Sequence, residues 1–306
     1  MAKRANKWLC AQIMTTSVCP ASCFYCAYPD GWHKQHPGHM TEETFELLLE
    51  RLRQVGDFSR GKICMYLMNE PLADPDICHR IERVQQSFPG TLIEINTNAL
   101  LLNEERGKQL AKVIEKQRHQ IHIHLSGYDE ETSQRAMGLP FQVRYDNVDR
   151  FLGLTADHNI HVEIEGFYRA EPNNGPILFS YHPWHAKMKE LSSGRAKSCD
   201  LYRFHDRAGT IKRHGDVNFG VRRDCDCDKP GEPCRRVHEW IHVDWQGRLR
   251  ICCNDYHREI VLKTIHEIPN LKEFLEGPEW EFVQRLSQGI EESLDTFICK
   301  RCRGNR

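Results

Sequence analysis

The sequence predicts an α/β fold in which a parallel sheet curves into a barrel. From residue 8 to about residue 168, short apolar stretches alternate with segments of helical periodicity, an order typical of parallel βαβ units. Polar residues follow directly after the expected strands, where the loops of parallel barrels carry their chemistry. The chain has 306 residues, which is enough for a barrel with one smaller module.

Five strands are expected, each a short apolar run that ends at polar residues: 8–17, 62–68, 91–96, 120–125 and 161–167. Between them, 41–55 opens with the capping-type sequence Thr41-Glu42-Glu43 and then places Phe45, Leu48 and Leu52 on one helix face. Similar periodicity predicts helices over 103–116 and 146–154.

The pattern changes after about residue 170. Proline, glycine and histidine in 171–176 and 181–185 indicate a loop or lid that contacts the substrate. Residues 240–252 read as two short strands joined by a turn at Gln246-Gly247, and helices are expected over 270–276 and 279–287.

The charge balance indicates a small or neutral partner. Lysine and arginine (42) nearly cancel aspartate and glutamate (43), so no phosphate-binding stripe for nucleic acid is expected. No run of 18 apolar residues and no signal-peptide pattern occurs, which predicts a soluble, cytoplasmic protein without a membrane partner.

Fourteen cysteines are many for a cytosolic chain and indicate metal binding rather than disulfides. Most fall into two groups, which predicts two metal sites. Cys10, Cys64 and Cys78 lie in or beside apolar stretches and are expected to be small buried side chains, whereas Cys199 is undecided. The 17 histidines are scattered, so single histidines receive little weight as ligands.

The first group is Cys19-Pro-Ala-Ser-Cys23-Phe-Tyr-Cys26, three thiolates in one loop after the first expected strand. One loop with this spacing can wrap an iron–sulfur cube and leave one iron open. A tetrahedral zinc site would need a fourth ligand from elsewhere in the chain.

This Cys-x3-Cys-x2-Cys loop resembles the motif of the radical S-adenosylmethionine superfamily, with Tyr25 as the aromatic residue before the last cysteine. The resemblance implies a partial (β/α)6 TIM-like barrel, a 4Fe-4S cluster whose open iron chelates S-adenosylmethionine, and an electron donor such as flavodoxin or ferredoxin. In that family, cleavage of S-adenosylmethionine gives a 5′-deoxyadenosyl radical that abstracts a hydrogen atom from the substrate.

Further segments resemble the family's cofactor contacts at the strand ends. Met68-Asn69-Glu70-Pro71 stands where the family binds the methionine amino group, and Glu70 is the preferred residue for that contact. On the alternative interpretation, Asn69 and Asn98 are turn residues and His124 is a core histidine. The residues expected at the cofactor are Tyr25, Asn69, Glu70, Thr97, Asn98, His124 and Ser126.

The second group resembles a twitch domain, the short relative of the SPASM domain. That resemblance implies one auxiliary 4Fe-4S cluster and a division of the chain into a core barrel (1–215) and a twitch domain of hairpin and helix (216–306). Either Cys225 or Cys227 could replace the first ligand, and a structural four-cysteine zinc site is the alternative. The expected ligands are Cys234, Cys252, Cys299 and Cys302.

Nearly the whole chain resembles radical S-adenosylmethionine enzymes that act on aminoglycosides and aminocyclitols, namely 2-deoxy-scyllo-inosamine dehydrogenases and neomycin epimerases. Arg207, in the segment 205–211, matches an arginine that lies near the substrate hydroxyl in the dehydrogenases. Cys253 resembles the thiol that returns a hydrogen atom in the epimerases. The two residues imply opposite outcomes at a carbinol carbon, a ketone or an inverted centre, and inversion is narrowly favoured.

Two other functions stay open. One is a peptide maturase that forms a crosslink, a thioether or a D-residue, although the cysteine loop begins at residue 19 and leaves no room for an N-terminal peptide-recognition domain. The other is a non-catalytic iron–sulfur or zinc protein, against which Glu70, Thr97 and Asn98 argue because such a protein needs no cofactor-binding groups.

Overall fold

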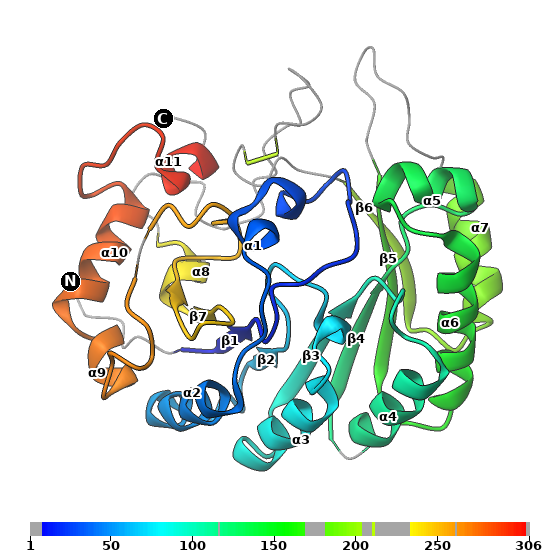
Figure 1. Cartoon of the computed structure of the whole chain (residues 1–306), viewed down its shortest axis with the longest axis horizontal. Coiled ribbons are helices and arrows are strands. Elements are labelled where there is room, and N and C mark those ends of the chain that lie inside the picture. Colours follow the sequence, from blue (N-terminus) through cyan, green and yellow to red (C-terminus); the bar gives the residue numbers. More distant parts are fainter. Residues whose placement is uncertain are drawn as a thin grey trace.

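The computed structural model describes residues 8–115, 117–168, 181–203, 210–211, 233–260 and 262–303. One sheet of eight strands curves through the molecule in the order β6-β5-β4-β3-β2-β1-β7-β8 (Figure 1). Neighbouring strands from β1 to β6 pair in parallel, as the α/β prediction requires. These six strands are β1 (Cys10–Ile13), β2 (Lys62–Cys64), β3 (Leu92–Thr97), β4 (His119–His124), β5 (His161–Tyr168) and β6 (Ser198–Arg203).

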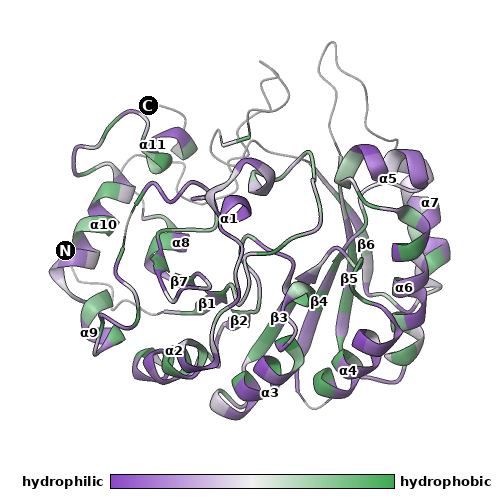
Figure 2. Cartoon of the chain, viewed as in Figure 1, coloured by the Kyte–Doolittle hydropathy of each residue, from purple (hydrophilic) through white to green (hydrophobic). Residues whose placement is uncertain are grey.

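Helices cover the outer side of this curved sheet (Figure 1). Their ribbons carry both hydrophobic and hydrophilic colours, as amphipathic helices do (Figure 2). In the first of them, Thr41 accepts a hydrogen bond from the Thr44 amide at 3.2 Å, so the expected helix cap is present. The outer helices are α2 (Glu42–Val55), α3 (Ile77–Ser87), α4 (Glu104–Ile114), α6 (Phe141–Leu154) and α7 (Tyr181–Ser192).

Short helices occupy the loops and the C-terminal region. They are η1 (Tyr28–Asp30), α1 (Trp32–Gln35), η2 (Pro71–Ala73), α5 (Glu130–Met137), α8 (Arg235–His238), α9 (Leu271–Leu275), α10 (Pro278–Gln288) and α11 (Ile298–Arg303). No helix of the described ranges is long and apolar enough to cross a membrane.

All five expected strands are confirmed, and β6 adds the sixth parallel strand of the (β/α)6 barrel that the family resemblance implied. The helix predicted over 146–154 begins earlier, at Phe141, because Pro140 fixes its own backbone angle at the N-cap position. Cys10 and Cys64 are buried as expected, whereas Cys78 is only partly buried.

The prediction of a loop or lid over 181–185 is wrong, because these residues form the first turns of α7. Pro183 is the third residue of the helix, where its missing amide hydrogen breaks no helical bond. Trp184 is fully buried and donates its indole N–H to the Leu125 carbonyl at 2.6 Å. Helix α7 is therefore a packed part of the barrel wall. Residues 171–176 lie outside the described ranges.

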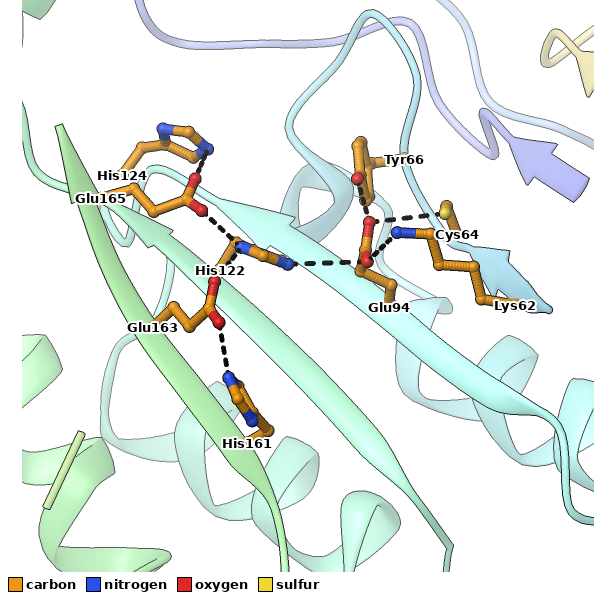
Figure 3. Close-up of polar contacts among 9 residues, drawn as sticks. All are labelled: Lys62, Cys64, Tyr66, Glu94, His122, His124, His161, Glu163 and Glu165. Atoms are coloured by element: carbon orange, nitrogen blue, oxygen red, sulfur yellow. Dashed lines mark hydrogen bonds and ion pairs between the residues drawn. The ribbon is translucent and has the colours of Figure 1, made fainter. Parts of the chain in front are cut away.

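The sheet has a polar concave side, which we call the inner face and which carries Lys62, Glu94, His122, Glu163 and Glu165 (Figure 3). Along β4 fully buried and partly exposed residues alternate, as expected for a strand packed against helices on one side only. The outer side of the sheet packs against the helices, and the inner face carries polar side chains that are available for binding or catalysis.

The C-terminal part continues the same sheet. Strand β7 (Trp240–Val243) lies parallel to β1, and β8 (Leu249–Arg250) pairs antiparallel with β7, so the predicted hairpin is confirmed. Its turn contains Gly247 at φ +74°, a left-handed conformation that suits glycine. The predicted domain division between 215 and 216 falls in residues that the structure does not describe.

Candidate active site

The loop after β1 carries the three predicted cluster cysteines. Cys23 is buried, whereas Cys19 and Cys26 are partly exposed. The Tyr28 amide lies 3.4 Å from the sulfur of Cys26 and donates to it. The side-chain amide of Asn98 lies 3.9 Å from the sulfur of Cys19. These donors suit sulfur atoms that carry negative charge.

The electrostatics of this loop fit a metal cluster. Burial and the neighbouring Cys26 raise the pKa of the Cys23 thiol to about 12, and burial raises the pKa of Cys19 well above its usual value. Thiolates in this position therefore need a cationic group such as iron.

Glu70 joins the ends of β2 and β3. One carboxylate oxygen accepts from the Leu72 amide at 3.1 Å and from the Thr97 hydroxyl at 2.7 Å, and the other accepts from the Asn98 amide at 2.7 Å. Burial is the main reason that the pKa of Glu70 is raised to about 7, and the three hydrogen bonds oppose that rise. The predicted residues Glu70, Thr97 and Asn98 are thus brought together.

Asn69 lies beside this group. Its side-chain oxygen Oδ1 accepts a hydrogen bond from the Leu67 backbone amide at 2.9 Å, a contact typical of a turn residue. Its amide nitrogen is buried and finds no hydrogen-bond acceptor among the described residues. A buried donor without an acceptor suits a polar ligand at this position.

Aromatic contacts connect the cysteine loop to β4 and β5. Tyr25 and Ser126 are in hydroxyl contact at 3.3 Å, and Ser126 also accepts from the Phe167 amide at 2.9 Å. The Phe167 ring lies between Tyr25, at 4.5 Å between ring centroids, and His124, at 5.4 Å. His124 directs Nε2 toward Glu165 at 3.2 Å, so it faces the inner face.

Arg144 supports this region and was missed by the sequence analysis. It is fully buried on α6 and donates to the Asn98 carbonyl at 2.7 Å, to the Ser133 hydroxyl at 2.9 Å and to the His124 carbonyl. It therefore fixes the ends of β3 and β4 against each other. An arginine in an amphipathic helix usually indicates a solvent-exposed face, and no sequence feature distinguishes this one.

The inner face carries a network of nine residues (Figure 3), which we call the inner-face network. His122 lies at its centre, with Nδ1 2.7 Å from Glu165 and 3.2 Å from Glu163, and Nε2 3.6 Å from Glu94. Its members are Lys62, Cys64, Tyr66, Glu94, His122, His124, His161, Glu163 and Glu165.

The sequence analysis missed most of this network because single histidines received little weight. A usable sign was present in Gln120-x-His122-x-His124 and His161-x-Glu163-x-Glu165, where polar residues alternate with apolar ones. Buried parallel strands normally read as nearly continuous apolar runs. Polar residues at every second position therefore indicate an inner face that performs a function.

The expected auxiliary cysteines gather beside the hairpin. Burial raises the pKa of Cys252 well above its usual value, and the nearby Cys253 and Cys299 add to the rise. Cys302 follows Cys299 three residues later on α11, and Cys234 caps α8. Cys225 and Cys227 lie outside the described ranges, so the choice of first ligand stays open.

Cys253 and Arg207 are the residues expected to decide between inversion and oxidation, and the structure describes only Cys253. Cys253 is partly buried, and its sulfur lies 2.8 Å from the Arg236 guanidinium. Arg207 lies outside the described residues.

The C-terminal region also contacts the first cysteine loop, which the sequence analysis did not anticipate. The Tyr256 hydroxyl lies 3.7 Å from the sulfur of Cys26, and the Trp32 amide donates to the Tyr256 carbonyl at 3.1 Å. The Arg258 guanidinium stacks on the Trp32 ring at 3.8 Å. The two cysteine groups therefore belong to one packed unit.

Solved structures share this fold at low sequence identity. BtrN in complex with AdoMet and 2-DOIA is 14% identical with a TM-score of 0.56, covering 97% of this chain and 92% of BtrN. SuiB of Streptococcus suis bound to precursor peptide SuiA is 13% identical with a TM-score of 0.64, covering 91% and 67%. The structure of anSMEcpe with bound AdoMet and Cp18Cys peptide is 16% identical with a TM-score of 0.55, covering 97% and 88%.

The family comparison covers the part of the chain that holds the cysteine loop and the strand ends. No curated protein matches the sequence. Residues 13–165, half of the chain, match the family described as the Radical SAM superfamily. The chain therefore belongs to the radical SAM superfamily of enzymes.

Proposed function

We propose that this enzyme abstracts a hydrogen atom from a carbinol C–H of a sugar, aminoglycoside or aminocyclitol and inverts that carbon. The observation that carries the proposal is Cys253 itself, a partly buried thiol directly after the buried Cys252. S-adenosylmethionine and a 4Fe-4S cluster supply the radical chemistry when bound. The proposed cluster ligands are Cys19, Cys23 and Cys26.

The cofactor pocket follows from the strand ends. We assign Glu70, Thr97 and Asn98 to the methionine end of S-adenosylmethionine, because three hydrogen bonds fix Glu70 there. The buried amide of Asn69 offers a further donor. Tyr25, His124 and Ser126 form the side that continues to the inner face, where the substrate would lie.

In this proposal Cys253 acts as the hydrogen-atom donor. The S–H bond of Cys253 breaks, its hydrogen atom forms the new C–H bond on the opposite face of the carbon, and a thiyl radical remains. One electron from a donor of the flavodoxin or ferredoxin class and one proton then restore the thiol. We assign an auxiliary 4Fe-4S cluster to Cys234, Cys252, Cys299 and Cys302.

Oxidation of the same carbinol to a ketone is the second candidate. The Arg236 guanidinium donates a hydrogen bond to the sulfur of Cys253 at 2.8 Å, so this sulfur already has a polar partner. If Cys253 gives no hydrogen atom, the substrate radical would lose a proton from its hydroxyl and an electron to an acceptor. The fold likeness to BtrN, which binds 2-DOIA, is compatible with this outcome.

A peptide substrate is the third candidate, because SuiB and anSMEcpe share the fold and are structures with bound peptides. The genes beside this one discriminate between the classes. A short precursor-peptide gene would favour a maturase, whereas genes for aminosugar synthesis would favour the carbohydrate substrate.

The deciding experiment uses the reconstituted enzyme with 2-deoxy-scyllo-inosamine or neomycin in D₂O. Inversion with return of hydrogen from the exchangeable thiol would place one deuterium on the inverted carbon. In Cys253→Ala, formation of 5′-deoxyadenosine should persist while the inverted product disappears.

The control is Cys199→Ala, which removes another partly buried thiol from outside both cysteine groups. It should leave the product unchanged. A ketone without deuterium from the wild-type enzyme would replace inversion by oxidation, and unaltered inversion in Cys253→Ala would remove the donor role.

A further inference from the structure

The inner-face network contains three side chains whose ligand atoms converge. Nδ1 of His122 lies 2.7 Å from Oε1 of Glu165 and 3.2 Å from Oε2 of Glu163. All three atoms lie within 4.8 Å of one another. A ring nitrogen carries at most one hydrogen, so it cannot serve both carboxylates with a good hydrogen bond. Glu165 is the nearer acceptor.

The spacing suits coordination of a metal ion. Ligand atoms about 2.1 Å from one ion are separated by roughly 3.0 to 3.4 Å along the edges of an octahedron or tetrahedron. The 3.2 Å separation from Glu163 lies within that range, whereas the 2.7 Å separation from Glu165 is shorter and would lengthen by a few tenths of an ångström around an ion. Strand pairing creates the arrangement, because His122 and Glu163 are register partners and Glu165 follows on the same side of β5.

Each of the three side chains is also held from behind. Nε2 of His122 faces Glu94 at 3.6 Å, Oε1 of Glu163 contacts His161 at 2.5 Å, and Oε2 of Glu165 contacts His124 at 3.2 Å (Figure 3). Glu94 is held in turn by Lys62 and Tyr66. A carboxylate behind a histidine is the usual outer support of a metal-binding imidazole, since it fixes the ring orientation.

Charge and access agree with a cation at this point. The network holds three carboxylates, and Lys62 is its one permanently charged cation (Figure 3). Against the effect of burial, hydrogen bonds to Glu165 and Glu94 also raise the pKa of His122 to about 10, so an ion at this point would displace a proton from the ring. The side chains of His122, Glu163 and Glu165 remain 13%, 18% and 10% exposed, so an ion can reach them. A divalent ion between the two carboxylates would offset their repulsion.

We propose that His122, Glu163 and Glu165 bind one divalent transition-metal ion on the inner face, separate from the cysteine sites. One nitrogen and two carboxylate oxygens favour zinc or manganese and contain no sulfur. Three protein ligands leave at least one position open.

Mn²⁺ is the first probe, because free Mn²⁺ is counted directly by electron paramagnetic resonance. Titration into the reconstituted holoenzyme, without S-adenosylmethionine or substrate, should show about one bound ion per chain. Glu163→Gln and Glu165→Gln should each weaken binding about tenfold or more, the scale of changes at metal sites. Glu131→Gln, at a residue 80% exposed on α5, should bind as the wild type does.

Zinc K-edge X-ray absorption of the wild-type holoenzyme gives a second test that needs no variant. A first shell of nitrogen and oxygen alone supports the site. A sulfur shell places the zinc on cysteines and overturns it, as does a wild-type chain that binds no Mn²⁺ or glutamine variants that bind it unchanged. Neither measurement involves turnover, so the outcome is independent of the proposed carbinol chemistry.

Discussion

Glu70 is the single residue that connects the most parts of the proposed cofactor pocket. Its carboxylate accepts from Leu72, Thr97 and Asn98, which belong to two strand ends. In Glu70→Gln the amide nitrogen would replace one acceptor oxygen, and a hydrogen bond to a charged group is worth about 1.5–3 kcal/mol. We expect cleavage of S-adenosylmethionine to fall roughly 10- to 100-fold.

The measurement is 5′-deoxyadenosine formation with dithionite at pH 8.5, above the pKa of about 7, where Glu70 is ionised. Iron content should not change. Thr97→Val removes only one of the donors and should cost less. Equal activity in Glu70→Gln and the wild type would refute the positioning role.

At the scale of residues, the sequence predicted those whose chemistry depends on spacing along the chain. Three cysteines within eight residues lie in the same loop in any fold. Cys19, Cys23 and Cys26 could therefore be predicted as one metal site from the sequence. The contacts of His122 with Glu163 and Glu165 depend instead on how β4 pairs with β5. The register of two strands cannot be predicted from the sequence of one strand alone. The inner-face network therefore required the structure.

Strand β8 ends in an ion-pair cluster that shapes the turn before the auxiliary cysteines. Arg250, Asp244 and Asp255 are all fully buried, with Arg250 3.2 Å from Asp255 and 3.9 Å from Asp244. Arg250→Met would leave two buried carboxylates without their cation. We expect a loss of about 3–5 kcal/mol in the free energy of unfolding.

Urea unfolding followed by circular dichroism tests this expectation. Arg285→Met is the matched control, because Arg285 is 47% exposed and pairs with Glu291 on the surface. That change should cost less than about 1 kcal/mol. Similar losses of unfolding free energy in both variants would show that the buried Arg250 ion pairs stabilise the fold no more than an exposed pair does.

Strand β4 begins with a histidine that folding keeps neutral. His119 is buried, and burial lowers its pKa to about 4 from an ordinary 6.5. Between pH 6.5 and about 4, His119 is therefore protonated in the unfolded chain and neutral in the folded protein. The stability that depends on neutral His119 is present above pH 6.5 and is lost as the pH falls toward 4.

We expect the wild type to lose about 3 kcal/mol relative to His119→Phe between pH 7 and pH 4, at about 1.4 kcal/mol per unit. Unfolding of both proteins at a series of pH values gives the difference. A difference that does not change with pH would mean that His119 is protonated in the folded protein.

Among the elements, those with local markers were predictable. Thr41 caps α2, and Gly247 supplies the left-handed turn of the hairpin, so both were found from sequence. Helix α7 was not, because Pro183 indicates a loop unless it falls in the first turn. The helix is stabilised by the burial of Trp184, a tertiary contact that the sequence of the segment does not show.

The whole molecule is expected to hold two iron–sulfur cubes. Anaerobic reconstitution should give about eight irons per chain, and Cys299→Ala with Cys302→Ala should leave about four. Iron and acid-labile sulfide analysis measures both. Retention of all the iron in the double variant would contradict the auxiliary site.

The pairing of β1 with β7 joins residues that are 230 positions apart in the sequence, such as Cys10 and Trp240 (Figure 1). On the ribosome, β1 emerges first and waits for some 230 residues until its second neighbour is made. Tyr256, which contacts Cys26, is made later still. The first cysteine loop is thus synthesised well before the C-terminal residue that contacts it. The sheet around β1 cannot be completed until most of the described chain has been made.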